Sequence, residues 1–147
     1  MKIELKKDPL VPENELHIHC RKITAEVQTV LNKLQVHKIS GKSPENETMV
    51  IPLLSVLYFE SVDKRVFAYT ENQVLETGYR LYELEEKFPA GWFFRISKTM
   101  IVNMGKIRSI RPEEGRRLKV QLQNGEWLLV SRAYAASFQR QLKEEIS

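Results

Sequence analysis

The sequence predicts a mostly β protein of the α+β class. It should contain antiparallel β-sheets with short helices, preceded by a small N-terminal strand-strand-helix extension. Short segments in which apolar and polar residues alternate recur from Met49 onward, a pattern typical of strands with one buried face. Asn124-Gly125 lies between two such segments and is the strongest short signal for a β-hairpin. The sequence lacks strand–helix alternation with a glycine-rich phosphate loop, which disfavours a nucleotide-binding α/β fold.

Residues 1–45 are predicted to form the extension. Residues 2–7 alternate weakly and residues 16–20 alternate cleanly, so each segment is expected to be a strand, with Cys20 as a small buried residue. Five apolar residues then recur at helical spacing and form one stripe: Ile23, Val27, Val30, Leu31 and Leu34. Because this stripe is apolar, we expect the extension to act in dimerisation or regulation.

Residues 46–147 are predicted to form the main domain. Its expected strands and first helix lie at residues 50–52, 56–60, 66–70, 73–76 and 80–87. The hairpin around Asn124-Gly125 is expected to have a type I′ turn, because both residues tolerate the positive φ that this turn requires. Ser131 is then expected to cap a last helix with Tyr134 and Phe138 on its apolar side.

Composition restricts the class of protein. A chain of 147 residues with 42% hydrophobic and 29% charged residues is typical of one compact globular domain with a small appendage. The longest apolar run, around residues 49–59, is interrupted by Pro52 and Ser55 and is too short to span a bilayer. The single cysteine, Cys20, excludes an internal disulfide and suits a reducing cytoplasm, where we expect the protein to act.

The positive charge is concentrated in one segment. Residues 92–132 hold nine Lys/Arg against three Asp/Glu, whereas residues 1–91 hold twelve against fourteen. A basic block on a nearly neutral chain indicates a polyanionic partner, and nucleic acid is the commonest one. The alternative from charge alone is a basic surface that is merely solvated.

The stretch FFRISKTMIVN sets a group of polar side chains between two apolar runs. Ser97 is expected to cap a short helix that begins at Lys98, and such a helix start attracts phosphate. Arg95 and Lys98 would stand beside it. Ser131-Arg132 repeats the arrangement at the start of the last helix. Two such starts in one basic block favour anion binding over the alternative of two ordinary helix starts with solvated cations.

No arrangement typical of catalysis occurs in the sequence. His17 and His19 lie two residues apart, but no second cluster completes a tetrahedral metal site, so we expect no metal. Glu83, Glu85 and Glu86 are expected to be solvated on a helix surface rather than to act as paired carboxylates. The chain is therefore not expected to be an enzyme or to bind a cofactor.

The resemblance to a known family lies in FFRISKTMIVN, the KIRSI that follows it, and GRRLKVQLQNGEWLLVSRAYAASFQRQL. These stretches resemble the LytTR family of bacterial DNA-binding domains. The family pattern is roughly F-x-R-x-H-R/K-S-x-I-V-N, followed by K-I, a glycine-turn hairpin and V-S-R. The resemblance covers about residues 48 to 143. The chain departs from it at Ser97, where many members have His, and at Thr99, where Ser is usual. The matching residues are Phe93, Arg95, Lys98, Ile101, Val102, Asn103, Lys106, Ile107, Gly125, Val130, Ser131, Arg132 and Tyr134.

The resemblance implies a domain that places three loops in successive major-groove faces of duplex DNA. The first loop would offer Lys64 and Arg65, the second would run from Arg95 through Ser97 to Lys98, and the third would be the helix start at Arg132. Arg132 would bridge a guanine bidentately, Lys98 would reach a base edge or a phosphate, and Arg95 would hold a phosphate.

The resemblance also implies partners. Family members commonly bind paired direct repeats as dimers, so a homodimer on promoter DNA is expected. Many members carry an N-terminal receiver domain, but about 45 residues are too few for one. The chain looks like the stand-alone members, which often pair with a small inhibitory membrane protein.

The sequence therefore predicts a bacterial transcriptional regulator that binds specific sequences of duplex DNA. One alternative is a protein-interaction module that docks an acidic partner through its basic face. Another is an RNA binder, which would need exposed aromatic residues on a sheet face. Trp92, Phe93 and Phe94 are more simply explained as core residues.

Overall fold

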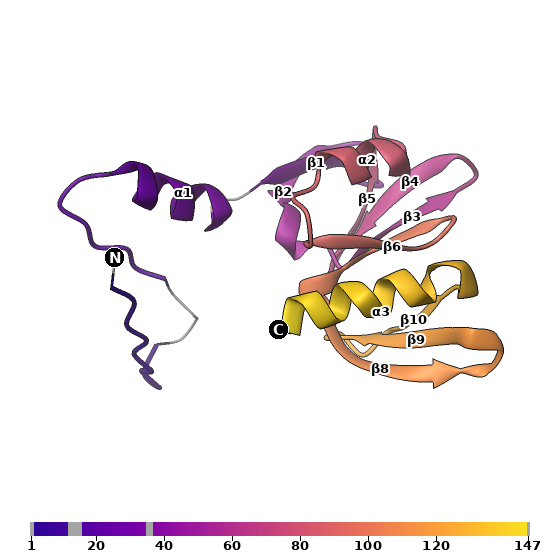
Figure 1. The fold of residues 1–147 in the computed structure, drawn as a ribbon. Coiled ribbons are helices and arrows are strands. Elements are labelled where there is room, and N and C mark those ends of the chain that lie inside the picture. The colour runs from indigo at the N-terminus through magenta and orange to yellow at the C-terminus, as the bar shows by residue number, and fades with distance from the viewer. Residues whose placement is uncertain (1, 12–15, 35–36, 147) are drawn as a thin grey trace. The chain divides into compact units, whose positions relative to one another are not determined.

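The computed structural model describes residues 2–11, 16–34 and 37–146, which divide between two compact units, Met1–Gln35 and Val36–Ser147 (Figure 1). Each unit has its own local structure and is described by itself. Among the described residues, no helix is long and apolar enough to cross a membrane.

The first unit contains the predicted helix, α1 (Ala25–Leu34). The hydroxyl of Thr24 accepts a hydrogen bond of 3.3 Å from the N–H of Val27, which satisfies a free donor at the helix start. The two predicted strands do not form, and both residues 2–7 and residues 16–20 lack regular structure. Cys20 is exposed, so the expectation that it is buried was wrong. Alternation alone does not produce a strand, because a strand also needs a partner for its backbone groups and a core for its apolar face.

The second unit contains a seven-stranded antiparallel sheet in the order β2-β1-β5-β4-β3-β7-β6 (Figure 1). The strands are β1 (Lys38–Lys42), β2 (Thr48–Pro52), β3 (Tyr58–Val62), β4 (Arg65–Tyr69), β5 (Val74–Thr77), β6 (Phe93–Ser97) and β7 (Met100–Asn103). A short 3₁₀ helix, η1 (Leu53–Ser55), leads into β3, and helix α2 (Leu81–Lys87) connects β5 to β6.

A three-stranded antiparallel sheet and the last helix complete the second unit. The strand order is β10-β9-β8. The elements are η2 (Met104–Lys106), β8 (Ile107–Glu113), η3 (Glu114–Arg116), β9 (Arg117–Leu122), β10 (Trp127–Val130) and α3 (Arg132–Ile146). The predicted mostly β fold with a few short helices is thereby confirmed.

The compact unit starts about ten residues before the predicted boundary at residue 45. β1 pairs with β2 along its length and with β5 at Lys42 and Glu76, and Ile39 is buried in the core. Residues 43–47 form the turn of the β1–β2 hairpin, in which the N–H of Ser43 donates to the carbonyl of Glu47 at 2.9 Å. The Ser-Pro-Glu-Asn sequence therefore forms a turn inside the compact unit.

The larger sheet is covered on both faces at its centre, so the second unit has two hydrophobic cores. One core lies with α2 and includes Ile39, Ile51, Phe59, Val66, Leu75 and Leu84. The other lies with the smaller sheet and α3 and includes Leu57, Ile96, Val102, Val120, Val130 and Phe138. Neighbouring residues of β3 and β7 point to opposite faces and are buried on both, which explains the continuous apolar runs in these strands.

The stretch FFRISKTMIVN forms the β6–β7 hairpin, and the helix predicted to begin at Lys98 is absent. The pairing runs from Phe93 opposite Asn103 to Ser97 opposite Met100. The hydroxyl of Ser97 accepts a hydrogen bond of 3.2 Å from the N–H of Thr99. Ser97 thus satisfies a free backbone donor as predicted, but it does so inside a hairpin turn, where serine uses the same chemistry.

The predicted β9–β10 hairpin forms, but its turn is of another type. Gly125 has a φ of +90°, and Asn124 is not among the described residues with positive φ, so the turn is not type I′. The N–H of Gly125 donates to the carbonyl of Leu122 at 2.9 Å, as in a type I turn followed by a left-handed glycine. Positive φ at two successive residues occurs instead in the β3–β4 hairpin, at Asp63 (50°) and Lys64 (65°).

Candidate nucleic-acid interface

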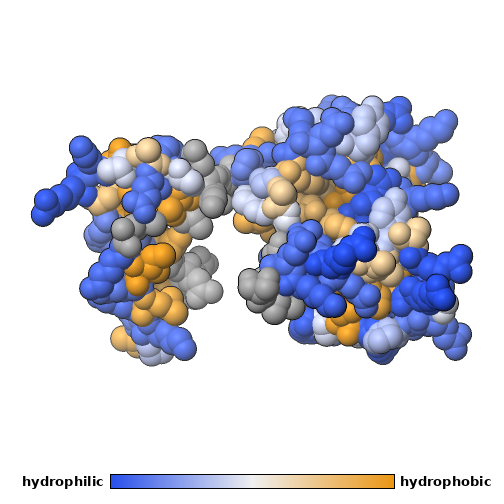
Figure 2. All heavy atoms as spheres, in the orientation of Figure 1, coloured by the Kyte–Doolittle hydropathy of each residue, from blue (hydrophilic) through white to orange (hydrophobic). Residues whose placement is uncertain are grey.

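Three turns carry the cations predicted from the sequence, and backbone hydrogen bonds tie them together. They are the β3–β4 turn, the β6–β7 turn and the start of α3. The N–H of Ser61 donates to the carbonyl of Thr99 at 2.8 Å, which joins the first turn to the second. The N–H of Ser131 donates to the carbonyl of Ile96 at 2.8 Å, which joins the third to the second. We call the surface formed by these turns the basic edge; Figure 2 shows many hydrophilic residues at this end of the second unit.

The β3–β4 turn presents Lys64 and Arg65. Lys64 is exposed at the tip of the turn, where its positive φ is uncommon for a residue other than glycine, asparagine or aspartate. The Nε of Arg65 donates to the carboxylate of Glu76 at 2.5 Å, and its guanidinium lies 5.3 Å from the centre of the Phe67 ring. The Arg65 side chain is nevertheless 65% exposed, so both cations of this turn can meet a partner.

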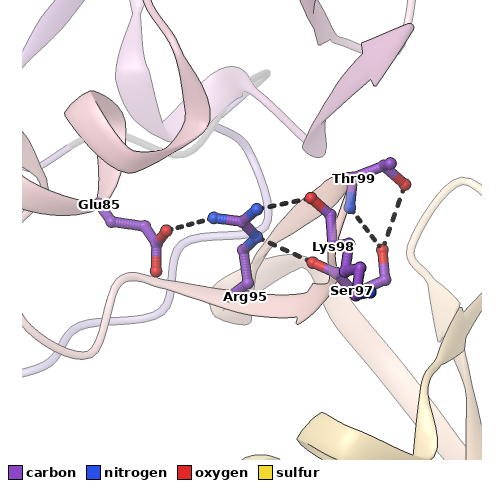
Figure 3. A network of polar contacts seen from close by, with 5 residues as sticks. All are labelled: Glu85, Arg95, Ser97, Lys98 and Thr99. Atoms are coloured by element: carbon purple, nitrogen blue, oxygen red, sulfur yellow. Dashed lines mark hydrogen bonds and ion pairs between the residues drawn. The ribbon is translucent and has the colours of Figure 1, made fainter.

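In the β6–β7 turn, Arg95 binds the turn itself (Figure 3). Its Nε donates to the carbonyl of Ser97 at 2.8 Å and one Nη donates to the carbonyl of Lys98 at 2.5 Å. The other Nη pairs with the carboxylate of Glu85, which comes from α2. The phosphate contact predicted for Arg95 would therefore compete with three internal acceptors. Lys98 contributes its carbonyl to this network, and its residue is exposed at the tip.

The third segment begins where the sequence predicts. α3 starts at Arg132, and the carbonyl of Ser131 accepts hydrogen bonds of 3.0 Å from the N–H groups of Tyr134 and Ala135. Arg132 is exposed, whereas Phe138 on the same helix is fully buried in the second core. The buried side of α3 thus fixes the helix, and Arg132 faces solvent from its first turn.

One basic residue beside this edge was not among the predicted contacts. Arg116 is exposed in η3, which joins β8 to β9 and lies against α3. It has a φ of +63° and follows Gly115, whose φ is +72°. Arg116 lies within the basic block of residues 92–132, but it belongs to none of the three contact loops predicted from the sequence. The Glu-Gly-Arg order was the available signal, because glycine between two alternating segments indicates a hairpin turn.

A partly buried polar contact connects the two sheets of the second unit. The Tyr58 hydroxyl on β3 donates to the Glu126 carboxylate at 2.7 Å, and the Tyr58 and Tyr69 rings stack with centres 4.5 Å apart. Burial and the nearby Glu126 carboxylate raise the pKa of Tyr58 far above its usual range. Tyr58 therefore stays protonated and donates this bond throughout the neutral range.

Asn103, which belongs to the resemblance, has a structural place. It is 2% exposed, and its amide donates to the carbonyls of Leu54 and Val56 at 3.2 and 2.8 Å. Its side-chain oxygen accepts the N–H of Gly105 at 3.0 Å. Asn103 therefore fixes the far end of the β6–β7 hairpin and is not available to a ligand.

The sequence model of the LytTr DNA-binding domain matches residues 46–143. The chain belongs to the LytTR family. It is 31% identical over 146 residues to a protein of Staphylococcus aureus strain MSSA476 described as an uncharacterized HTH-type transcriptional regulator, an alignment that spans 97% of this chain and 98% of the relative. A similarly described protein of strain MRSA252 is 30% identical with the same coverage.

A solved structure supports the same assignment. The LytTr DNA-binding domain from Bacillus cereus superposes with a TM-score of 0.68 at 28% sequence identity. The superposition covers 71% of this chain and 95% of the solved domain. The LytTR fold predicted from the sequence is thus confirmed.

Proposed function

We propose that this LytTR protein is a bacterial transcriptional regulator that recognises duplex DNA with its basic edge in the major groove. The observation that carries the proposal is the pair of backbone hydrogen bonds from Ser61 to Thr99 and from Ser131 to Ile96. They join three separate, cation-bearing turns into one rigid surface. A rigid array of cations that includes arginine suits a duplex, because phosphates fix the register and arginine reads guanine at base edges.

The residues of the edge have different roles in this proposal. Arg132 leaves the first turn of a fixed helix and would bridge a guanine O6 and N7 with its planar fork. Lys98 would reach a base edge or a phosphate, whereas Lys64, Arg65 and Arg116 would hold phosphates. Ser97 would shape the contact turn through its bond to the Thr99 N–H.

The assembly and cellular setting are part of the proposal. A homodimer on paired repeats would double the contacts made by one edge, and unit Met1–Gln35, with its helix α1, would assist dimerisation or regulation. The protein would act in the cytoplasm. An inhibitory membrane protein would be its further partner, as expected from the stand-alone members that the sequence resembles. Catalysis has no role in this function.

A selection and competition experiment tests the proposal. The full chain is used to enrich a binding site from random-sequence duplexes, and its affinity for the enriched duplex is measured against RNA and polyglutamate competitors. We expect one enriched motif that only duplex DNA of that sequence displaces efficiently. Equal displacement by polyglutamate would favour the protein-docking alternative, and stronger displacement by RNA would favour an RNA-binding function.

A further inference from the structure

We propose that Glu85 and Arg95 form a clamp that holds the β6–β7 turn in shape, so that Arg95 positions Lys98 toward DNA instead of binding a phosphate. The inference rests on the proposed function, because it concerns how one contact turn of the basic edge is held. It assigns Glu85, a residue of α2 outside the three contact turns, a part in DNA binding.

The clamp uses all three nitrogen atoms of the Arg95 guanidinium (Figure 3). Two N–H groups of Arg95 bind the successive carbonyls of Ser97 and Lys98, and a third group pairs with Glu85. The Arg95 side chain is 21% exposed, and Glu85 already balances its charge. A phosphate would have to use the two N–H groups that stay outside this network, beside the negative charge of Glu85, or displace one of these partners. The internal contacts therefore disfavour a phosphate at Arg95.

The turn needs such a hold because its ladder is irregular. The pairing of β6 with β7 shifts register between Arg95 and Ser97, which is a β-bulge. Ile96 lies in the bulge, with its side chain fully buried and its carbonyl bound to the N–H of Ser131. The carbonyls of Ser97 and Lys98, on the outer side of the bulge, are the two that Arg95 binds. Arg95 therefore stabilises the part of the hairpin that the bulge distorts.

The position of this turn affects the whole edge. The turn is bonded to the β3–β4 hairpin through Thr99 and to the start of α3 through Ile96. Of the two backbone carbonyls that Arg95 binds, that of Lys98 is the closer, at 2.5 Å. A loosened turn would lose the placement of Lys98 and would weaken the support for both neighbouring segments.

The effect of removing Glu85 distinguishes a clamp from a phosphate ligand by its sign. If Arg95 bound a phosphate, Glu85→Ala would free its guanidinium and remove a nearby negative charge, and DNA binding would tighten. If Arg95 is a clamp, the same change weakens binding although the protein becomes more positive. Glu86→Ala is the matched control, because Glu86 lies on the same helix turn and the three partners of Arg95 do not include it.

The first measurement is fluorescence anisotropy of the full-length variants with the enriched duplex at several salt concentrations. We expect Glu85→Ala to bind about tenfold more weakly, close to the value of one misplaced base-edge contact. Glu86→Ala should bind as the wild type or slightly more tightly. Binding by Glu85→Ala that equals or exceeds that of Glu86→Ala overturns the clamp.

Arg95→Lys provides a second test, since lysine keeps the charge but cannot form a planar fork with three acceptors. We expect it to bind as weakly as Arg95→Ala, and we expect Glu85→Ala to add less than about twofold to the loss caused by Lys98→Ala. Wild-type binding by Arg95→Lys would overturn the clamp and would support the phosphate contact.

A third measurement needs no DNA and therefore separates this inference from the proposed function. The side-chain Nε–H of Arg95 should give a slowly exchanging NMR signal in the wild type and in Glu86→Ala, and it should exchange rapidly in Glu85→Ala. A wild-type protein that binds no duplex but retains this signal would refute the proposed function and leave the clamp intact. Rapid exchange in the wild type would overturn the clamp.

Discussion

Two arginine–glutamate pairs at the basic edge differ in the exposure of the arginine side chain and in the number of its internal partners. Arg65 meets Glu76 with both its Nε and one Nη on a single carboxylate oxygen, and its side chain is 65% exposed. Arg95 meets Glu85 and two backbone carbonyls, and its side chain is 21% exposed. The two pairs look alike in a list of ion pairs, but only one of them builds the turn beside it.

The difference follows from solvation. An exposed ion pair contributes about 0–1 kcal/mol, because water and salt screen it, so Arg65 can exchange Glu76 for a phosphate at little cost. A hydrogen bond from a charged group contributes about 1.5–3 kcal/mol where it is shielded from water, and the bond from Arg95 to the Ser97 carbonyl is partly buried. The basic edge therefore contains residues that present charge and residues that hold the presenting turns in place.

The largest effect is expected at Asn103, a buried polar residue that holds the β6–β7 hairpin. Asn103→Ala should lower the free energy of unfolding by about 2–4 kcal/mol, because it leaves the buried carbonyl of Val56 and the partly buried N–H of Gly105 without their partners. Urea denaturation measures this change. Asn72→Ala, at an exposed turn position, is the control, and an equal loss in both variants would contradict the holding role.

The next effect concerns Arg132, a residue that presents charge. Arg132→Ala should weaken binding to the enriched duplex by about tenfold to a hundredfold, since a bidentate guanine contact is worth about 1–3 kcal/mol. It should flatten the preference at one base pair and leave stability unchanged. Lys98→Ala should weaken binding with a smaller change in sequence preference. Wild-type affinity of Arg132→Ala for both enriched and scrambled duplexes, measured with circular dichroism as a folding check, would remove α3 from the interface.

The arginine pairs themselves allow a direct comparison of stability. Arg95→Ala should lower the free energy of unfolding by about 1–2 kcal/mol, whereas Arg65→Ala should lower it by less than about 1 kcal/mol. In DNA binding, Arg65→Ala should reduce the slope of log K against log salt by about 0.9, the value of one phosphate contact. Equal losses of stability in thermal or urea unfolding would mean that exposure does not distinguish the two pairs.

The smallest effect on recognition is expected from the N-terminal unit. A chain that begins at Val36 should select the same motif as the full chain, because every proposed contact residue lies in the second unit. A chain that begins after Lys42 should be unstable, since it lacks β1 and the buried Ile39. Binding-site selection with both truncated chains tests this difference, and a changed motif from the chain that begins at Val36 would show that the first unit reads bases.

The features that the sequence predicts correctly depend on local chemistry. The β9–β10 hairpin follows from Asn124-Gly125 between alternating segments, and α3 begins beside Ser131 as predicted. The sequence predicts a helix start at the β6–β7 turn, because a serine hydroxyl accepts a nearby backbone N–H both at a helix start and in a hairpin turn. The predicted boundary places β1 in the extension, because β1 joins the domain through its pairing with β2 and β5, and that pairing is not visible in the local sequence.

The candidate site was predictable in its members but not in their roles. The basic block at residues 92–132 identifies Lys98 and Arg132, since clustered charge is visible in the sequence, whereas Lys64 follows only from the resemblance to the family. The commitment of Arg95 to Glu85 depends on α2 packing beside β6, and no local pattern encodes that contact. Tertiary contacts therefore decide which of the basic residues can meet a partner.

The central claim is that the basic edge recognises duplex DNA by sequence. The most direct test measures binding to the enriched duplex and to a scrambled duplex over a range of salt concentrations. If one protomer neutralises three or four phosphates, through Lys64, Arg65, Arg116 and Lys98, log K should fall with log salt with a slope of about −3 to −4 for the enriched duplex. At fixed salt, the enriched duplex should bind at least about a thousandfold more tightly than the scrambled one. Equal affinity for the two duplexes, or an affinity that salt does not change, would contradict the account.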